Sequence, residues 1–138
     1  MEILELFLIK HFLVAISDPL YQNPDRSFVN AGVCARRRGD FAGAEGYFRS
    51  ALKLQPNQIQ ALYQLADMSY ARASYREARA ALARLVPVAS GSPEILWLML
   101  RTERRLGDGN ALDSLAHQLR TNFPDSKEAA LLSAGQFD

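Results

Sequence analysis

The chain has 138 residues, of which 49% are hydrophobic and 22% charged, so it is long enough to bury one core or to form about four stacked helical hairpins. Sixteen basic and fifteen acidic residues leave a formal net charge of +1, which excludes a global field that attracts nucleic acid or anionic lipid. A single cysteine, Cys34, excludes a disulfide framework within the chain, and no stretch approaches the roughly 20 apolar residues of a membrane span.

The first predicted element is a helix over residues 2–17, where apolar residues recur at helical spacing. Its apolar face would carry Leu4, Phe7, Leu8, Phe12 and Ala15. Because Phe12 and Ala15 have the same spacing as Phe48 and Ala51, we interpret this segment as the second helix of a partial repeat.

This N-terminal segment also has the apolar character of a signal peptide. However, Glu2 and Glu5 occupy the place of its positive region, and no small-residue cleavage site follows. We therefore expect no export signal in the chain as written. An exposed apolar stripe on this helix would be a surface for homo-oligomerisation.

Three helical hairpins and a short capping helix are predicted after it, over residues 25–57, 58–91, 92–123 and 126–134. Asn23 suits the N-cap of the first hairpin, and Pro24 suits its first helical position. The helices of the three hairpins are expected to turn at Gly39–Asp40, Ala73–Ser74 and Gly107–Asp108. Ser92 is the predicted cap of the third hairpin, and Asp125 or Ser126 that of the last helix.

Equivalent positions of the hairpins recur every 34 residues without a gap. The shared registers include Phe28, Leu62 and Leu96; Ala31, Leu65 and Met99; Gly32, Ala66 and Leu100; Ala44, Ala78 and Leu112; and Phe48, Leu82 and Ala116. This period is that of the tetratricopeptide repeat (TPR), a helix–turn–helix unit that stacks into a solenoid. We predict an all-α TPR-type solenoid of stacked hairpins with a C-terminal capping helix; the alternative is a non-repeating helical bundle. Small residues at Gly32 and Ala66 predict that first and second helices cross closely there.

In a TPR stack the first helices line a concave groove, so positions one repeat apart fall on one surface. The rows predicted to face it are Val29, Tyr63 and Trp97; Val33, Asp67 and Arg101; and Arg36, Tyr70 and Arg104, with Arg37 and Arg105 beside them. Such a strip suits a peptide with apolar anchors and carboxylates. Tyr63, Tyr70 and Trp97 are the predicted anchors. The alternative is that the Arg residues form solvated helix faces and Trp97 packs against a neighbouring helix.

No pattern for catalysis or cofactor binding is found in the sequence: it has no phosphate-binding loop, nucleophile elbow or paired carboxylates. Cys34 is predicted to be a small buried residue within a helix. His11 and His117 fall in different repeats, and neither has a second ligand at metal spacing. We expect a non-catalytic scaffold without cofactor or metal.

Thirteen of the sixteen basic residues are Arg, which suits polar recognition but is equally explained by a GC-rich genome. Arg36-Arg37-Arg38 is a short basic run without a supporting Lys cluster, so we expect no nucleic-acid partner. The competing hypothesis, an RNA-binding helical repeat, would show RNA affinity that falls steeply with salt.

A long junction precedes the first full hairpin, in which Asp18-Pro19-Leu20-Tyr21 leads through Asn23-Pro24-Asp25-Arg26-Ser27 to Asn30-Ala31-Gly32. This junction resembles that of the PilF/PilW family, TPR proteins of type IV pilus biogenesis that are sometimes called pilotins. Two later stretches are similar as well: Ala44-Glu45-x-Tyr47-Phe48-x-x-Ala51-Leu52, which any TPR protein can supply, and Leu119…Phe123-Pro124-x-Ser126. The resemblance covers about residues 12–138.

The resemblance implies lipoproteins at the inner leaflet of the outer membrane, which help the pilus secretin to reach that membrane, assemble into its multimer or remain stable. It implies a secretin partner, a periplasmic location and about six TPR units, of which this chain matches the C-terminal half. The chain departs from the family by lacking the lipoprotein signal with its lipidated Cys and the upstream repeats. If family members pair this cysteine with one upstream, Cys34 has lost its partner.

Together these observations predict a non-catalytic protein-interaction scaffold of type IV pilus biogenesis. The alternative is a general TPR adaptor or co-chaperone in a cytoplasmic complex, which is consistent with the expected lack of an export signal.

Overall fold

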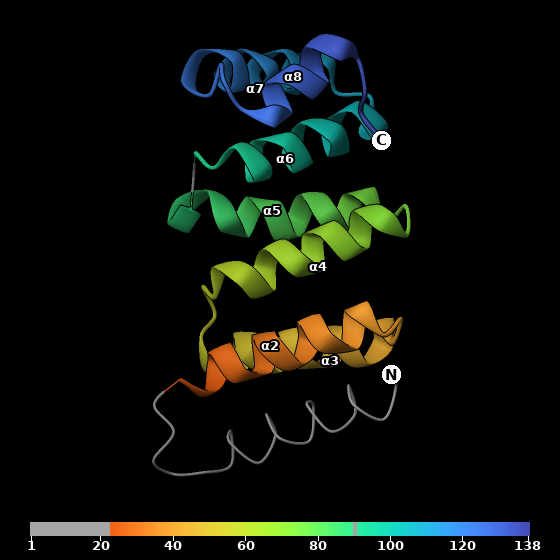
Figure 1. The fold of residues 1–138 in the computed structure, drawn as a ribbon, viewed down its shortest axis with the longest axis vertical. Helices are drawn as coiled ribbons and strands as arrows, with labels where there is room; N and C mark the ends of the chain where they lie inside the picture. The colour runs from red at the N-terminus through yellow and green to blue at the C-terminus, as the bar shows by residue number, and fades with distance from the viewer. Residues whose placement is uncertain (1–22, 90) are drawn as a thin grey trace. The chain divides into compact units, whose positions relative to one another are not determined.

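The computed structural model describes residues 23–89 and 91–138, and these divide into two compact units, residues 23–65 and residues 66–138. The described residues form seven α-helices and no strand, which confirms the predicted all-α fold class (Figure 1). None of these helices is both long and apolar enough to cross a membrane. The helix predicted over residues 2–17, with its proposed oligomerisation stripe, lies outside the described residues.

The helices alternate with short turns along the chain. They are α2 (Pro24–Arg37), α3 (Phe41–Leu54), α4 (Ile59–Ala71), α5 (Tyr75–Ala89), α6 (Pro93–Leu106), α7 (Gly109–Asn122) and α8 (Lys127–Ala134).

Polar side chains begin four of these helices by accepting a hydrogen bond from an otherwise unpaired main-chain N–H. Asp40 accepts from Gly43 at 2.9 Å, Ser92 from Ile95 at 3.3 Å, Asp108 from Ala111 at 3.1 Å, and Ser126 from Ala129 at 3.0 Å. Asn23 occupies the N-cap position of α2, as expected, but its side chain makes no cap hydrogen bond. Pro24 has no N–H, so this helix start has one donor fewer to satisfy.

The turns between paired helices use the left-handed backbone conformation. Gly39 and Gly107 have φ of +83° and +80°, as predicted for the ends of α2 and α6. The α4–α5 turn makes the same conformation with Ala73 at φ +63°. There the Ala73 N–H donates to Tyr70 O at 3.0 Å and the Ser74 N–H to Ser69 O at 2.8 Å.

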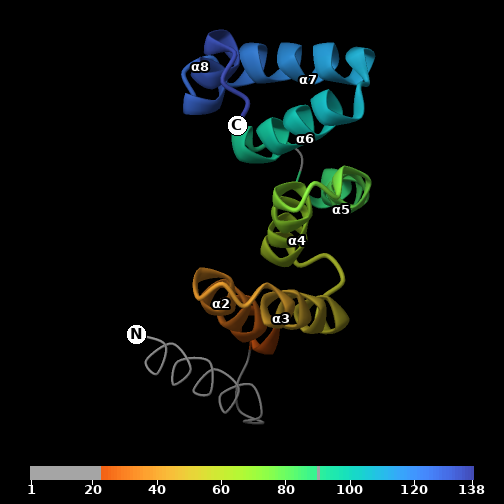
Figure 2. The same cartoon turned by 90° about the vertical axis from the view of Figure 1, so that its right-hand side faces the viewer.

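The first unit is built on the pair of α2 and α3, which pack side by side (Figures 1 and 2). Gly32 lies against the Phe48 ring so closely that a Cβ at this position would be 2.5 Å from a ring carbon. This confirms the predicted close crossing at Gly32. Cys34 is only partly buried, contrary to the prediction, because Ala31 and Ala35 occupy the buried stripe and Cys34 lies at its edge.

The second unit has its core where α6, α7 and α8 meet. Its buried members are Leu96, Trp97, Leu100, Leu115, Ala116, Leu119, Ala129 and Leu132. Helix α5 packs on α6, while α8 contacts both α6 and α7 and contributes Ala129 and Leu132 to the core. The last helix therefore caps the third hairpin, as predicted.

Candidate functional site

Five predicted groove residues come together in the second unit. Tyr70 lies in the last turn of α4, while Trp97, Arg101, Arg104 and Arg105 lie on α6. Arg101 follows Trp97 by four residues, and Arg104 and Arg105 follow Arg101 by three and four. Residues at these spacings share one face of a helix. We call these five side chains the aromatic–arginine surface.

The surface is held by contacts between guanidinium groups and aromatic rings. The guanidinium carbon of Arg101 lies 4.8 Å from the Tyr70 ring centre and 5.7 Å from that of Trp97. The buried Nε of Arg101 has no hydrogen-bond partner among the described residues. Each such ring contact contributes about 0.5–1 kcal/mol where it is partly exposed, so Arg101 is oriented by ring faces rather than by an acceptor.

The segment after α8 lies on this surface. Gly135, at φ +70°, ends the helix, and the N–H of Gln136 donates to Leu131 O at 3.0 Å. The chain thus reverses in a helix-terminating motif that sends the next residues back across α6. Phe137 then stacks on Trp97, with ring centres 5.8 Å apart and planes at 17°. The guanidinium carbon of Arg104 lies 4.3 Å from the centre of the Phe137 ring.

Asp138 completes this arrangement through its side-chain carboxylate. The Tyr70 hydroxyl donates to one carboxylate oxygen at 2.7 Å, and Arg105 forms an ion pair with the other. The hydrogen bond from Tyr70, followed by the charges of Arg105 and Arg101, lowers the pKa of Asp138. Burial, followed by the hydrogen bond to Asp138, raises the pKa of Tyr70, so its hydroxyl remains a donor. The surface therefore binds one carboxylate beside one aromatic ring.

Trp97 has two roles in this unit. Its side chain is 8% exposed and belongs to the buried core cluster, and its ring also supports Phe137. Of the two sequence interpretations of Trp97, packing against neighbouring helices is therefore observed, while its ring still lines the aromatic–arginine surface. The remaining predicted residue of this unit, Asp67, is half-buried on α4, three residues before Tyr70.

The predicted groove residues of the first unit differ in their burial and contacts. Val29 is buried, Val33 and Tyr63 are half-buried, and Arg37 is exposed. Arg36 donates to the side-chain oxygen of Gln64 at 2.7 Å and so connects α2 with α4. Within the basic run, Arg38 pairs with Asp40 at 3.0 Å. Two of its three Arg residues therefore already have protein partners.

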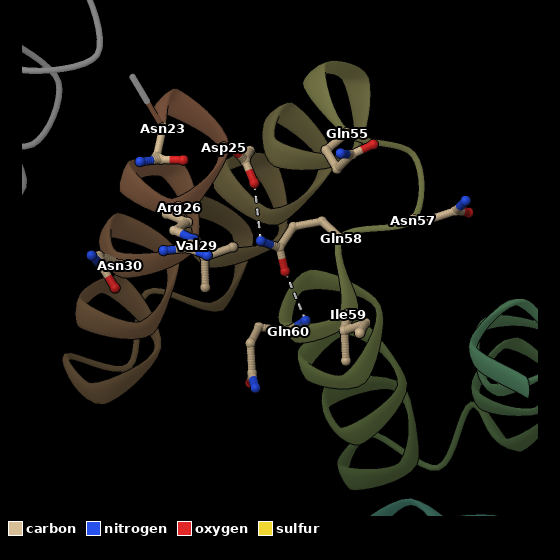
Figure 3. Close-up of a pocket in the computed structure, with 10 residues that line it drawn as sticks. All are labelled: Asn23, Asp25, Arg26, Val29, Asn30, Gln55, Asn57, Gln58, Ile59 and Gln60. Carbon is tan, nitrogen blue, oxygen red and sulfur yellow. Dashed lines mark hydrogen bonds between the residues drawn. The ribbon is translucent and has the colours of Figure 1, made fainter. Parts of the chain in front are cut away.

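A polar hollow of about 850 Å³ lies beside the starts of α2 and α4 in the first unit (Figure 3). Amide side chains dominate its wall, and Gln58 links the two helices. Its side-chain nitrogen donates to Asp25 at 3.1 Å, and its side-chain oxygen accepts from the Gln60 N–H at 2.8 Å. Amides both donate and accept hydrogen bonds, so this hollow suits polar or main-chain groups.

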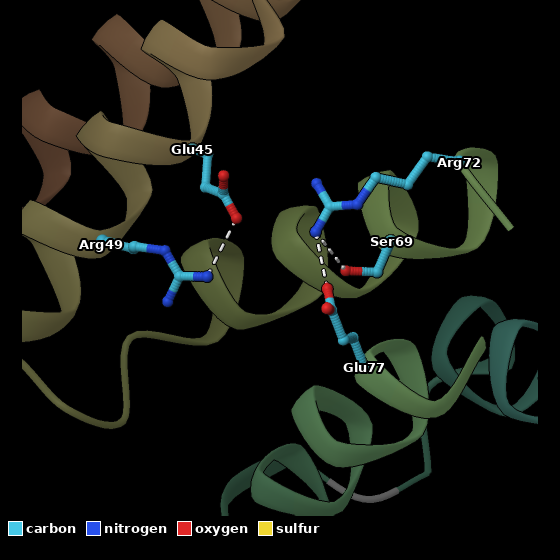
Figure 4. A network of polar contacts seen from close by, with 5 residues as sticks. All are labelled: Glu45, Arg49, Ser69, Arg72 and Glu77. Carbon is cyan, nitrogen blue, oxygen red and sulfur yellow. Dashed lines mark hydrogen bonds and ion pairs between the residues drawn. The ribbon is translucent and has the colours of Figure 1, made fainter. Parts of the chain in front are cut away.

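Other polar contacts lie on exposed helix faces and stabilise the helices locally. Figure 4 shows Arg49 paired with Glu45 at 2.9 Å in the first unit and, in the second, Arg72 paired with Glu77 at 2.7 Å. An i,i+4 pair such as Glu45–Arg49 contributes about 0.3–0.5 kcal/mol. Arg79 on α5 donates through Nε to Glu103 on α6 at 2.9 Å.

The described residues include no group of three or more His, Cys, Asp and Glu side chains that is placed to hold a metal ion. Cys34 is a free thiol. His117 is exposed on α7, while His11 lies outside the described residues.

Sequence reasoning missed three residues that complete the candidate site: Tyr75, Phe137 and Asp138. Tyr75 lies edge-on to Tyr70, with ring centres 5.3 Å apart, and its ring centre is 5.8 Å from the guanidinium carbon of Arg105. Phe137 and Asp138 follow Gly135 outside the 34-residue register, so the repeat pattern does not place them. The sequence feature that could have indicated them is Gly135, which ends the last helix, with the aromatic Phe137 and the acidic Asp138 shortly after it.

Comparison with known proteins supports the fold and the resemblance. A sequence-family model for the tetratricopeptide repeat matches residues 35–102. The type IV pilus assembly protein PilF of Pseudomonas aeruginosa is 28% identical over 119 residues, which cover 86% of this chain and 47% of that protein. The chain thus spans about half the length of this curated relative.

Two solved structures share the arrangement of helices. The crystal structure of PilW, described as a widely conserved type IV pilus biogenesis factor, matches with a TM-score of 0.80 and 27% identity, over 91% of this chain and 57% of that one. The structure of Pseudomonas aeruginosa PilF matches with a TM-score of 0.79 and 27% identity, over 92% of this chain and 57% of that one. The chain therefore has a tetratricopeptide-type fold and resembles the type IV pilus biogenesis factors PilF and PilW.

Proposed function

We propose that this chain is a non-catalytic interaction module of type IV pilus biogenesis and that its aromatic–arginine surface binds a segment of another pilus assembly protein. The observation that carries the proposal is the convergence of Tyr70, Trp97 and Arg101 with two further Arg side chains in one unit. Aromatic and Arg side chains dominate binding energy where an interface excludes water. The likeness to PilF and PilW supports the process in which the module acts.

The partner in this proposal is the pilus secretin, which the chain helps to localise, assemble or stabilise on the periplasmic side of the outer membrane. A guanidinium has a planar set of donors that suits carboxylates, so an acidic partner segment fits Arg101, Arg104 and Arg105. In the first unit, Val29, Val33, Arg36, Arg37 and Tyr63 remain proposed contributors to partner binding, as does Asp67 in the second.

A pull-down of the secretin with purified variants tests the proposal. The variant Arg101→Ala with Arg104→Ala removes two guanidinium groups from the surface and should weaken secretin binding by at least about tenfold, equal to about 1.4 kcal/mol. The matched control is Arg76→Ala with Arg120→Ala, which removes two positive charges from exposed positions on α5 and α7. Secretin binding that is equal in both variants and the unmodified chain would exclude this surface.

Trp97 is unsuited to this test, because Trp97→Ala removes a buried core side chain as well as a surface ring. Tyr63→Ala, at a half-buried position, examines the first unit separately. A loss of binding in this variant but not in the Arg101→Ala and Arg104→Ala variant would move the contact to the first unit.

A further inference from the structure

We propose that the aromatic–arginine surface recognises a partner segment in which an aromatic residue is followed directly by an acidic one, and that Phe137–Asp138 occupies this surface in cis until that segment replaces it. The inference rests on the proposed function: it names the chemistry of the partner segment and a control that the chain exerts on its own site.

The first part of the recognition is a place for an aromatic ring. The Phe137 ring stacks on Trp97 and also meets the guanidinium of Arg104 at 4.3 Å. An aromatic side chain can stack on the Trp97 ring and also form a cation–π contact with Arg104. An aliphatic side chain makes both interactions less well. This place therefore selects Phe, Tyr or Trp.

The second part is a place for a carboxylate at the next residue along the chain. Asp138 accepts a hydrogen bond from the Tyr70 hydroxyl and pairs with Arg105. The two donors come from different helices, α4 and α6, so they fix the position of the carboxylate and not only its charge. Because the ring and the carboxylate belong to consecutive residues, the surface favours an aromatic residue followed by an acidic one over the reverse order.

The surface carries more positive side chains than the one carboxylate of Asp138 can pair with. Arg105 pairs with this carboxylate and Arg101 interacts with it at longer range, while Arg104 lies over the Phe137 ring. Of the three acidic residues on the same two helices, Glu103 is already paired with Arg79, and Glu94 accepts a hydrogen bond from Ser92 at the start of α6. The third, Asp67, lies three residues before Tyr70. A partner segment with further acidic residues thus complements the surface better than the single Asp138 does.

Weak, exposed contacts hold the carboxylate of the resident segment Phe137–Asp138, so a partner segment can replace it. The resident segment lies outside any helix, and its carboxylate and the Arg105 side chain are 48% and 40% exposed. Ion pairs with this exposure are screened and weak. The covalent link nevertheless gives Phe137–Asp138 an effective concentration on the order of millimolar, which raises the apparent Kd of any competing segment. Only a partner with additional contacts then displaces it.

The test uses a synthetic peptide with the sequence of residues 134–138, acetylated and amidated at its ends, and the full chain carrying Phe137→Ala and Asp138→Asn. We expect the peptide to bind this opened variant at least about tenfold more tightly than the unmodified chain, whose surface is occupied. Titration calorimetry gives the affinity, and emission of the single tryptophan, Trp97, locates the event.

Control peptides carry the Phe→Ala or the Asp→Asn change, and both should bind the opened variant more weakly than the parent peptide. Phe137 also touches the core cluster, so far-UV circular dichroism must show native helicity. The variant Asp138→Asn alone leaves that packing in place and should show a smaller gain in the same direction. Equal affinity for the opened variant and the unmodified chain, or no peptide binding to either, would overturn the inference.

The secretin pull-down separates this inference from the proposed function. Peptide binding that requires both Phe and Asp, without secretin capture by any variant, supports the recognition chemistry and removes the secretin as partner. Secretin capture that is insensitive to Phe137→Ala with Asp138→Asn, in a chain that binds no peptide, keeps the proposed function and overturns the inference.

Discussion

The helix pairs α2–α3 and α6–α7 place the large and the small side chain of their crossing on opposite helices. In the first pair, Gly32 on the leading helix leaves room for Phe48 on the second. At the equivalent positions of the other pair, Leu100 is the large residue and Ala116 the small one, and both belong to the buried core. The comparison teaches that the hairpin conserves total volume at this crossing and not the size of either side chain.

The exposed faces of the two units differ more than their packing does. The first unit offers an amide-lined hollow beside the starts of α2 and α4, whereas the second offers stacked rings and Arg side chains, covered by Phe137 and Asp138. The repeat thus places side chains at equivalent positions, and the residue at each position decides what the face binds.

The largest expected effect is the loss of the Phe48 ring. Phe48→Ala should lower the free energy of unfolding by about 3–5 kcal/mol, because the ring is fully buried against Gly32 and its removal leaves a cavity. Phe41→Ala is the matched control on the same helix, since that ring is 59% exposed, and its effect should stay below about 0.5 kcal/mol. Urea unfolding followed by circular dichroism measures both. Similar losses in the two variants would contradict the packing described for the first unit.

A methyl group at Gly32 tests the same crossing from the other side. Gly32→Ala should lower the free energy of unfolding by about 1–3 kcal/mol, because its Cβ would overlap the Phe48 ring. Gly46→Ala is the control, since its Cβ would meet nothing within 4 Å, and it should stabilise α3 by about 0.5–1 kcal/mol. Thermal melts of the two variants should therefore shift in opposite directions. A shared direction would contradict the tight contact described between Gly32 and the Phe48 ring.

Helix caps give a smaller contrast between the units. Asp108→Ala should cost about 1 kcal/mol, because it removes the acceptor for the Ala111 N–H at the start of α7. Asn23→Ala should leave stability nearly unchanged, since the Asn23 side chain makes no cap bond to α2. Chemical unfolding measures the free energy of unfolding of both variants. An equal decrease in Asn23→Ala and Asp108→Ala would contradict the lack of a side-chain cap bond at Asn23.

The smallest effect on global stability is expected from pH, and it concerns the resident segment alone. The pKa of Asp138 is lowered by Tyr70, Arg105 and Arg101, so docking is fully stabilised above the ordinary Asp pKa and is lost as pH falls through the lowered value. Trp97 emission should therefore change on acidification before the helices unfold. The Asp138→Asn variant should lack this transition, and a transition that persists in it would assign the change to another group.

Most features of the fold could be predicted from the 34-residue register of the sequence. The register placed the left-handed Gly39 and Gly107, the caps at Asp40 and Asp108, and the close crossing at Gly32, because each follows from local geometry repeated at a fixed interval. Asn23 lies at the N-cap of α2 without a side-chain cap bond, because the preference of a residue type for this position does not determine whether the bond forms.

The candidate site was predicted only in part. Tyr70, Arg101 and Arg104 follow from the row alignment, and the second unit brings them together with Trp97. Phe137 and Asp138 do not follow, because a segment outside the repeat has no register, and its position depends on tertiary contacts with α4 and α6. The burial of Trp97 was one of two open interpretations, since one ring can serve the core and a surface together.

The α4–α5 turn has a further consequence for protein engineering. Ala73 adopts a left-handed conformation that an L-residue with a side chain reaches only at a cost of about 1 kcal/mol, whereas its counterparts in the other two turns are glycines. Two main-chain hydrogen bonds hold this turn, so its shape tolerates the unfavourable residue. A designer can therefore relieve strain by a single replacement with glycine at an exposed turn and raise thermal tolerance without altering any residue of the aromatic–arginine surface.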